Sequence, residues 1–181
     1  MMEDLSLHIL DIAENAVAAG ASKVSISINE NEGRDLLSIR IMDNGRGMSK
    51  EVRKRALDPF FTTKNKKTGL GLPFLAQAAG LAGGRMIVES APGRGTRIIA
   101  CFRFSHIDRQ PLRKMAETMM TLVLGHPEID FRYRHRRNGR EFRFRSRRFI
   151  AEGGAGSPTD PQLILAVRKD LREGLKQIGQ L

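Results

Sequence analysis

Apolar residues recur along the first part of the chain at two spacings, one helical and one extended. In residues 5–19 they share one arc of a helix, which Gly20 would end. This arc consists of Ile9, Ile12, Ala13, Ala16 and Val17. Residues 23–29 and 36–42 then alternate between apolar and polar positions around a polar turn at 30–35, which predicts an antiparallel hairpin.

Two further helices are predicted after this hairpin. Ser49 is placed to cap a short helix that ends near Leu57. Residues 58–68 are polar and rich in lysine, without any period, which predicts a loop. A longer helix is then predicted from Gly69 to about Ala82.

Alternating positions return in residues 85–90 and 95–104, on either side of a turn at 91–94. The chain therefore runs in the order helix, two strands, helix, loop, helix, two strands. Helices and strands in this order predict an α+β fold in which a layer of helices covers a sheet. We expect this domain to span residues 1–105.

Residues 106–181 are expected to form an extension. A helix is predicted over 111–124, followed by a hairpin that turns at Asn138-Gly139. An amphipathic helix is predicted over 162–178 at the end of the chain.

Composition narrows the class of protein. The 181 residues are 40% hydrophobic and 28% charged, as in an ordinary globular protein. No apolar run approaches the roughly 20 residues that span a bilayer, and the acidic N-terminus lacks the features of a secretory signal. We therefore expect a cytoplasmic protein that does not contact the membrane. Cys101 is the single cysteine, which excludes an internal disulfide framework and a cysteine-cluster metal site.

The net charge of +11 is unevenly distributed. Residues 1–105 carry 15 lysines and arginines against 11 acidic residues, whereas residues 106–181 carry 16 against 9, so most of the excess lies in the extension. This balance indicates an anionic partner without identifying its class.

The Asn-Gly turn also fixes the register of the basic hairpin in residues 130–149. The facing pairs are Arg137 with Arg140, Tyr133 with Phe144, His135 with Phe142, Arg134 with Arg143, and Arg132 with Arg145. Like charges that face each other across strands destabilise a hairpin, so this face needs anionic neighbours or screening by solvent. Three explanations stay open: a solvated or internally compensated face, an acidic protein partner, and nucleic acid, for which no recognised motif is present.

Two glycine-rich segments suit contact with a nucleotide. Residues 43–48, DNGRGM, follow a predicted strand, and their glycines let the backbone approach a flat ligand closely. Residues 68–72, TGLGL, precede a helix whose exposed N–H groups attract phosphate. Asp-Asn-Gly is also common turn chemistry, so neither segment decides the matter alone. The spacing of TGLGL matches neither a dinucleotide-binding fold nor a P-loop.

Five features occur in succession along the chain: Asn15 on the first helix, DNGRGM at 43–48, DPFFTTK at 58–64, TGLGL at 68–72 and GRGT at 93–96. In this order the chain resembles the GHKL ATPase superfamily, which unites DNA gyrase B subunits, a heat-shock chaperone, histidine kinases and MutL mismatch-repair proteins. The resemblance covers residues 8–105. It implies the Bergerat fold, a two-layer sandwich with a mixed sheet and helices on one face, and it implies ATP and Mg²⁺ as ligands.

By this resemblance, Asn15 would bind magnesium through its amide oxygen. Asp43 would accept a hydrogen bond from the exocyclic amine of adenine, and Thr96 would support that contact from the neighbouring strand. Lys64 would reach the terminal phosphates and offset their charge. The remaining nucleotide contacts would come from Gly45, Gly47, Met48, Phe61, Thr62, Thr63, Thr68, Gly69, Leu70, Gly71 and Leu72.

Asp11 departs from the family pattern. It lies one helical turn before Asn15, at the position where the resemblance implies a glutamate general base in members that hydrolyse ATP. Aspartate keeps the carboxylate but shortens its reach, so a role as general base is a hypothesis. Glu14 lies about 100° around the helix from Asn15, which favours a position facing solvent. His8 lacks the flanking pattern of a phosphoacceptor, and we expect it to pack beside the site.

The resemblance implies a regulatory protein that binds Mg-ATP, such as a histidine-kinase-like or anti-sigma-like protein kinase. Histidine kinases carry a dimerising hairpin with the phosphorylated histidine upstream of this domain. We expect none in this chain, so the phosphoacceptor would belong to a separate partner. The alternatives are an ATP-gated binding module with little turnover and a nucleic-acid-linked ATPase of the gyrase or MutL type.

Overall fold

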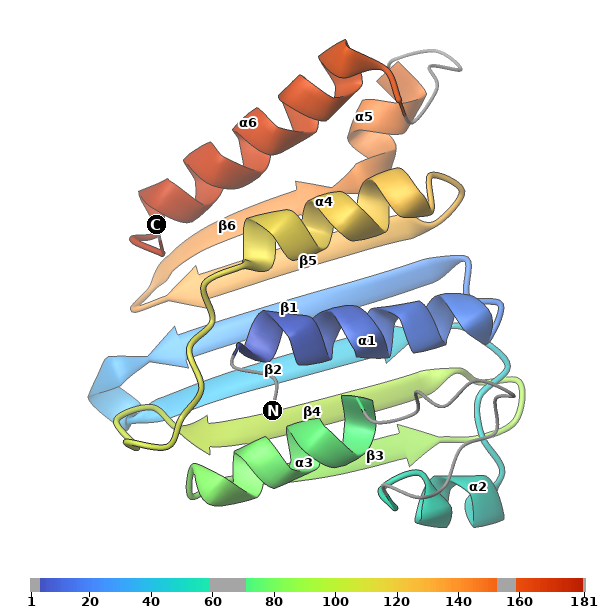
Figure 1. The fold of residues 1–181 in the computed structure, drawn as a ribbon, viewed down its shortest axis with the longest axis vertical. Helices are drawn as coiled ribbons and strands as arrows, with labels where there is room; N and C mark the ends of the chain where they lie inside the picture. The colour runs from blue at the N-terminus through green and yellow to red at the C-terminus, as the bar shows by residue number, and fades with distance from the viewer. Residues whose placement is uncertain (1–3, 59–70, 153–158, 181) are drawn as a thin grey trace.

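One mixed sheet runs through the described part of the chain, which comprises residues 4–58, 71–152 and 159–180 of a computed structural model (Figure 1). Its six strands lie in the order β3-β4-β2-β1-β5-β6. They are β1 (Lys23–Asn31), β2 (Leu36–Asp43), β3 (Arg85–Ser90), β4 (Thr96–Arg103), β5 (Asp130–Arg137) and β6 (Arg140–Arg145). Neighbouring strands are antiparallel except for β1 and β5, which are parallel.

The helices lie on one face of this sheet (Figure 1). They are α1 (Leu5–Ala18), α2 (Lys50–Arg55), α3 (Gly71–Leu81), α4 (Met115–Gly125), α5 (Ser146–Glu152) and α6 (Pro161–Gln177), with a short 3₁₀ turn η1 (Glu32–Arg34) between β1 and β2. α1 lies between α3 and α4, and α6 packs against β6 at the edge of the sheet. The predicted α+β sandwich is therefore confirmed. No helix among the described residues has the length and apolar character needed to cross a bilayer.

Local signals place the first elements where the pattern predicts them. Asp4 caps α1 by accepting a hydrogen bond of 2.9 Å from the backbone N–H of Ser6. Gly20 follows the helix in the left-handed region, with φ of 77°. Ser49 caps α2 by accepting from the N–H of Val52, which confirms that prediction.

The basic hairpin has the predicted register. Asn138 and Gly139 have φ of 47° and 89°, as a two-residue hairpin turn requires. All five predicted facing pairs are observed between β5 and β6. The hairpin is shorter than predicted, because β6 ends at Arg145 and residues from Ser146 form α5. The Ser146 hydroxyl accepts from the N–H of Phe131 at 2.9 Å and donates to the carbonyl of Ile129 at 3.1 Å, which turns the chain away from the ladder.

The extension joins the sheet of the first domain. β5 pairs with β1 from Lys23 opposite Asp130 to Glu30 opposite Arg137. A buried polar chain crosses this pairing: Nε2 of His135 lies 2.6 Å from Oε1 of Glu30, and its Nδ1 lies 2.6 Å from the Tyr133 hydroxyl. Burial raises the pKa of Tyr133 well above its ordinary value, so the hydroxyl keeps its proton.

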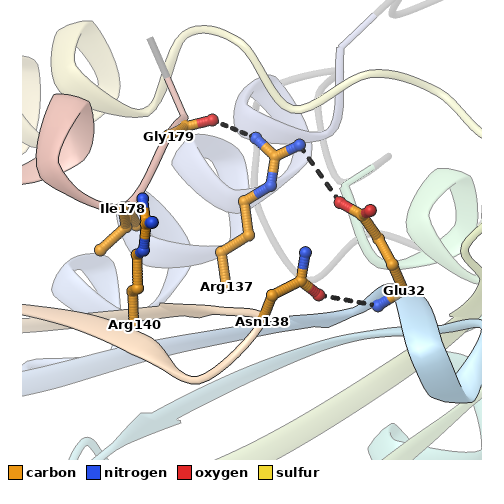
Figure 2. A pocket seen from close by; sticks show the side chains of 6 residues that line it. All are labelled: Glu32, Arg137, Asn138, Arg140, Ile178 and Gly179. Carbon is orange, nitrogen blue, oxygen red and sulfur yellow. Dashed lines mark hydrogen bonds and ion pairs between the residues drawn. The ribbon is translucent and has the colours of Figure 1, made fainter.

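The last residues of the chain are held against the turn of the basic hairpin (Figure 2). The guanidinium of Arg137 donates to the carbonyl of Gly179 and lies 3.4 Å from a carboxylate oxygen of Glu32. Asn138 accepts from the N–H of Glu32 at 3.0 Å. These contacts connect the end of β1, the hairpin turn and the C-terminal end of α6.

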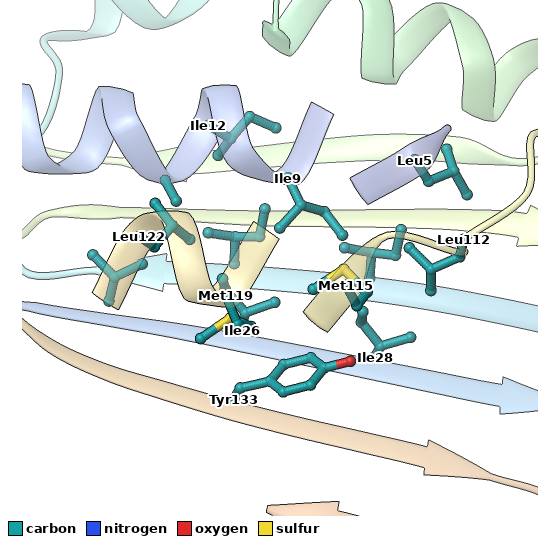
Figure 3. Packing of buried hydrophobic residues seen from close by; sticks show 14 of the residues in the cluster. Leu5, Ile9, Ile12, Ile26, Ile28, Leu112, Met115, Met119, Leu122 and Tyr133 are labelled. Carbon is teal, nitrogen blue, oxygen red and sulfur yellow. The ribbon is translucent and has the colours of Figure 1, made fainter. Parts of the chain in front are cut away.

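Both parts of the chain share one hydrophobic core (Figure 3). Its side chains in Figure 3 come from α1, α4, β1 and β5, and the segment just before α4. They include Leu5, Ile9, Ile12, Ile26, Ile28, Leu112, Met115, Met119, Leu122 and Tyr133, all at most 4% exposed. Burying one such aliphatic side chain contributes roughly 1.5–3 kcal/mol, so the extension is part of what holds α1 on the sheet.

The helix α4 begins later than predicted, at Met115 instead of Pro111. The residues before it bond to the start of α1: Pro111 accepts from the N–H of Leu5 at 2.9 Å, and Arg113 donates its N–H to Asp4 at 3.0 Å. These tertiary contacts take the place of the first helical turn.

Gly174 allows α6 to lie directly on β6. A Cβ at this position would stand 2.1 Å from the ring of Phe142. We expect Gly174→Ala to lower the free energy of unfolding by about 1–3 kcal/mol, the usual cost of overpacking, as measured by urea denaturation.

Gly80 of α3 is the matched control, because a Cβ there would meet no atom within 4 Å. Gly80→Ala should raise the free energy of unfolding by about 0.4–1 kcal/mol through the entropy of the unfolded chain. Equal effects of the two substitutions would contradict the close packing of α6 on Phe142.

Candidate functional site

Two turns meet at one end of the sheet, where β2 ends and β3 turns into β4. Residues 43–48 form the first turn and residues 91–95 the second. The N–H of Gly93 donates to the carbonyl of Arg46 at 2.7 Å, and the N–H of Met48 donates to Oγ of Ser90 at 2.8 Å. The DNGRGM turn at 43–48 is thus bonded to the turn at 91–95, which contains most of the GRGT segment.

Glycine is required where the two turns touch. Gly47 has φ of 68°, and a Cβ on it would lie 2.0 Å from the carbonyl oxygen of Ala91. Gly95 has φ of 73°, and a Cβ on it would lie 2.0 Å from the carbonyl oxygen of Asp43. Any side chain at either position would force the turns apart.

Asp43 is held at the centre of this contact. Its Oδ1 accepts from the N–H of Gly45 at 2.8 Å and from the N–H of Thr96 at 3.3 Å. Among the described residues, no bond is made to Oδ2, which stays available as an acceptor. Burial raises the pKa of Asp43, although the two N–H groups act in the opposite direction. The carboxylate is therefore positioned by the backbone and is only partly compensated.

Asn44 and Ser90 complete the turns, and the sequence did not single out either residue. Oδ1 of Asn44 accepts from the N–H groups of Ser22 and Lys23 at 3.0 and 2.9 Å, which joins the first turn to the start of β1. Ser90 bonds to Met48, Gly95 and Thr96. The signal that could have found Ser90 is its place opposite Thr96 at the end of a predicted strand.

The start of α3 lies against α1. A Cβ on Gly71 would stand 2.5 Å from Oδ2 of Asp11, so this carboxylate rests on the backbone of the first turn of α3. Asn15 lies one turn further along α1 and is half-buried, as Asp11 is. Leu72 packs against the hydrophobic core. The structure therefore brings Asp11 and Gly71 together, and their roles at a nucleotide stay predictions.

Part of the predicted site lies outside the described residues. This applies to Phe61, Thr62, Thr63, Lys64, Thr68, Gly69 and Leu70. Their predicted contacts to the nucleotide stay predictions.

His8 and Glu14 contact the extension. His8 is 2% exposed, and its Nε2 lies 3.0 Å from Oε1 of Gln110. Burial lowers the pKa of His8, so the ring is neutral at physiological pH. This agrees with the predicted packing role. Glu14 bonds to Nε2 of His126 at 3.0 Å, so the prediction that it faces solvent omitted this partner.

The pocket in Figure 2 lies away from these turns. It has a volume of about 390 Å³ and is lined by Glu32, Arg137, Asn138, Arg140, Ile178 and Gly179. The start of β1 pairs with Asp43, whereas its end pairs with Arg137. Val24 pairs with Asp43 and Glu30 with Arg137, so the six steps between them along β1 place the two sites about 20 Å apart at roughly 3.3 Å per residue. The pocket is therefore not part of the candidate site.

A comparison with known sequence families agrees with this geometry. Residues 3–106 match the family described as "Histidine kinase-, DNA gyrase B-, and HSP90-like ATPase". The chain belongs to this ATPase family. The matched segment contains α1, both turns and the start of α3.

Several curated relatives are named as kinases or regulatory proteins. The chain is 39% identical over 98 residues to the nitrogen regulation protein NtrY of Azorhizobium caulinodans, which covers 50% of this chain and 12% of that protein. It is 34% identical over 92 residues to sporulation kinase D of Bacillus subtilis (50% and 18%). It is 39% identical over 94 residues to the signal transduction histidine-protein kinase AtoS of Escherichia coli (51% and 16%). The match thus spans less than a fifth of each relative.

Solved structures share the fold of the ATPase domain. The N-terminal domain of a DNA repair protein superposes with a TM-score of 0.57 at 14% identity, covering 86% of this chain and 58% of that one. The MutL ATPase domain of Aquifex aeolicus, complexed with ADP, superposes with a TM-score of 0.52 at 17% identity, covering 96% and 70%. The second match includes nearly the whole extension.

The variant Asp43→Asn tests the cost of burying the charge of Asp43. Because burial raises the pKa of Asp43 in the folded chain, its ionised form destabilises the fold at neutral pH. Asparagine at this position should raise the free energy of unfolding at neutral pH, measured by urea denaturation. The gain should vanish as the pH falls through the raised pKa toward the ordinary value of about 3.9, because wild-type Asp43 is then neutral as well.

Asp35→Asn is the control of opposite sign. The hydrogen bond from Arg103 lowers the pKa of Asp35, so its ionised form stabilises the fold above the ordinary pKa. Neutralising it should lower stability at neutral pH and have no effect at low pH. If Asp43→Asn also lowered stability at neutral pH, the cost of burying the Asp43 charge would be disproved.

Proposed function

We propose that the chain binds Mg-ATP between the turns 43–48 and 91–95, α1 and the start of α3, and transfers a phosphoryl group to a separate protein. The single observation that supports this most is the geometry of Asp43. Its carboxylate is half-buried, two backbone N–H groups hold one oxygen, and the other is available to accept from an exocyclic amine. Residues 1–105 would form the nucleotide-binding unit and residues 106–181 its extension, in a cytoplasmic protein.

Asn15 and Asp11 suit magnesium in their chemistry. Magnesium prefers oxygen ligands and keeps several waters, so it is bound by few protein groups together with phosphates. Both residues lie on α1, and Asp11 reaches the start of α3, where helical N–H groups attract phosphate. Asn15 would hold the metal, whose charge would offset that of the phosphates.

The histidines of the chain support an acceptor on another protein. His8 and His135 are at most 2% exposed. His126 bonds to Glu14, and His106 accepts from the N–H of Asp108. All four histidines of the sequence are thus engaged in contacts that hold the fold. These contacts disfavour the four histidines as phosphoacceptors, and the proposal therefore places the acceptor on a separate protein.

Asp11 also supports a second candidate function, an ATP-gated binding module with little turnover. A general base must reach a water molecule beside the terminal phosphate. Asp11 lies against the backbone of Gly71, so its carboxylate would contact the start of α3 in addition to any water molecule that it activates. In the module, ATP would change the contact between α1 and α3 without being consumed.

Asp11→Asn decides between these functions. With the wild-type chain, calorimetry should show binding of ATP that strengthens with Mg²⁺, and Asn15→Ala should remove the dependence on the metal. If the chain is a kinase or ATPase, Asp11→Asn should keep nucleotide affinity and lower turnover of labelled ATP by about 10²-fold or more.

Each result selects one function. Label on an added protein supports the kinase, free phosphate supports an ATPase, and unchanged ATP with normal binding supports the module. Hydrolysis that DNA stimulates would support the nucleic-acid-linked alternative. The absence of heat and of thermal protection with millimolar Mg-ATP would disprove the nucleotide site itself.

We further propose that the partner is an acidic protein bound at the open face of the sheet, opposite the helices. On this face Asp130 bonds to Arg132 and Arg145 at 2.9 and 3.0 Å, and Glu141 bonds to Arg134 and Arg143. Each carboxylate therefore holds two facing arginines, which leaves one positive charge in each group. These internal partners compensate the hairpin only in part.

The same face favours protein over nucleic acid. Met42 and Ile87, on its other half, are 43% and 44% exposed. Apolar side chains next to arginines are typical of protein interfaces. Bases of single-stranded nucleic acid usually stack on aromatic rings, and the aromatic residues of the six described strands, including Phe131, Tyr133 and Phe144, are on the buried face.

We expect the double variant Arg134→Gln, Arg143→Gln to weaken labelling of an acidic partner while ATP affinity stays unchanged. The loss should grow as salt is lowered, because surface attraction is screened by ions. Arg168→Gln with Arg172→Gln on α6 removes the same charge from exposed positions on the other side of the sheet. An equal loss of labelling in both double variants would show that only net charge matters. It would contradict the proposal that the partner binds at the open face of the sheet.

A further inference from the structure

Ser90 connects the two turns that face the proposed nucleotide. It is the last residue of β3 and pairs with Thr96 of β4. Its Oγ accepts from the N–H of Met48 at 2.8 Å, donates to the carbonyl of Gly95 at 2.8 Å, and lies 3.0 Å from Oγ1 of Thr96. One hydroxyl thus contacts the DNGRGM turn and the GRGT turn together.

The proton count of this hydroxyl determines the direction of its bonds. A serine hydroxyl has one proton and two lone pairs. Gly95 is buried, and a buried carbonyl is normally satisfied by a donor. When the Ser90 hydroxyl donates to the carbonyl of Gly95, the two lone pairs of Ser90 Oγ accept from the N–H of Met48 and from the O–H of Thr96. All three contacts are then satisfied at once, and the Thr96 proton is committed to Ser90.

This arrangement controls what Thr96 can offer a ligand. With its proton on Ser90, Oγ1 of Thr96 presents only lone pairs. Oδ2 of Asp43 also presents only lone pairs. The N–H of Thr96 is not available to a ligand, because it already donates to Oδ1 of Asp43. The two side chains therefore form a pair of acceptors, which matches a base with an amino group at position 6 and opposes a base with a carbonyl there.

We propose that Ser90 is a positioning residue for base selection: it keeps Thr96 as an acceptor, so the site prefers 6-aminopurine over 6-oxopurine nucleotides. This inference rests on the proposed binding of ATP by the turns. Sites that hydrogen-bond a ligand group discriminate strongly against analogues that lack it, because buried polar groups are left unpaired. In Ser90→Ala the Thr96 hydroxyl is free to rotate and to donate to a 6-oxo group.

The turns have other connections that should survive this substitution. Arg46 still accepts from Gly93, and Asp43 still accepts from Gly45 and Thr96. The fold should therefore be retained in Ser90→Ala, and thermal melting without nucleotide checks this. Ser90→Thr keeps the hydroxyl and should restore wild-type behaviour. Ser38→Ala on β2 is the matched control, since Ser38 is a half-buried strand serine away from the turns.

The test is calorimetry of the full chain with Mg-ATP and with Mg-ITP, which carries a 6-oxo group. The wild type, Ser90→Thr and Ser38→Ala should prefer ATP. In Ser90→Ala the ratio of the two affinities should fall by about tenfold, the value of roughly one hydrogen bond. If Ser90 had only a structural role, its substitution would weaken the binding of both nucleotides equally and leave the ratio of affinities unchanged.

The other outcomes are distinguishable. A wild type that prefers ATP, with an unchanged ratio in folded Ser90→Ala, overturns the role of Ser90 and leaves the proposed function intact. A wild type that binds neither nucleotide overturns both. Should Ser90→Ala fail to fold, Thr96→Val provides the second measurement. It must lower the same ratio, because it removes the acceptor directly, and a normal ratio there overturns the inference.

Discussion

The candidate site depends on the placement of one half-buried carboxylate between two turns that come from different strands. Asp43 ends β2, yet Thr96, which begins β4, supplies one of its two backbone donors. This is feasible only where the backbones approach closely, and the glycines at 47 and 95 leave no room for a side chain. Burying the Asp43 charge here costs stability. In the proposed function, Oδ2 of the same carboxylate recognises the ligand.

The helix that faces this site is supported from the side of the extension. Asp4 bonds to the N–H of Arg113, the Thr118 hydroxyl donates to the carbonyl of Ser6, and Glu14 bonds to His126. These contacts run along α1 from its cap to the residue next to Asn15. The extension therefore helps to position the helix that carries the residues proposed to bind magnesium.

The sequence predicted which arginines of the hairpin face each other, but it did not show which groups compensate their charge. The register puts like charges opposite each other, and the structure has this register. The compensation comes from Asp130, which is nearly buried at the start of β5, and from Glu141 within β6. The hydrogen bond from Arg143 lowers the pKa of Glu141, so this carboxylate stays ionised at neutral pH. Part of the charge remains for a partner.

The sequence alone determined whatever depends on neighbours along the chain. Helical and extended periods located the elements of the first domain, Asn138-Gly139 set the hairpin register, and Ser49 marked the start of α2. The order of the motifs indicated the family and the positions of Asp43 and Thr96. These features follow from local backbone preferences and from residue spacing, which a single sequence contains.

Only the tertiary structure decided which distant segments meet. No local pattern states that β5 pairs in parallel with β1, that Pro111 bonds to Leu5 in place of a helical turn, or that Ser90 contacts Thr96 and Met48 together. Such contacts are chosen by the burial of whole faces and by the need of each buried polar group for a partner. Those requirements are met between residues far apart in the chain, so they become visible only when the chain is folded.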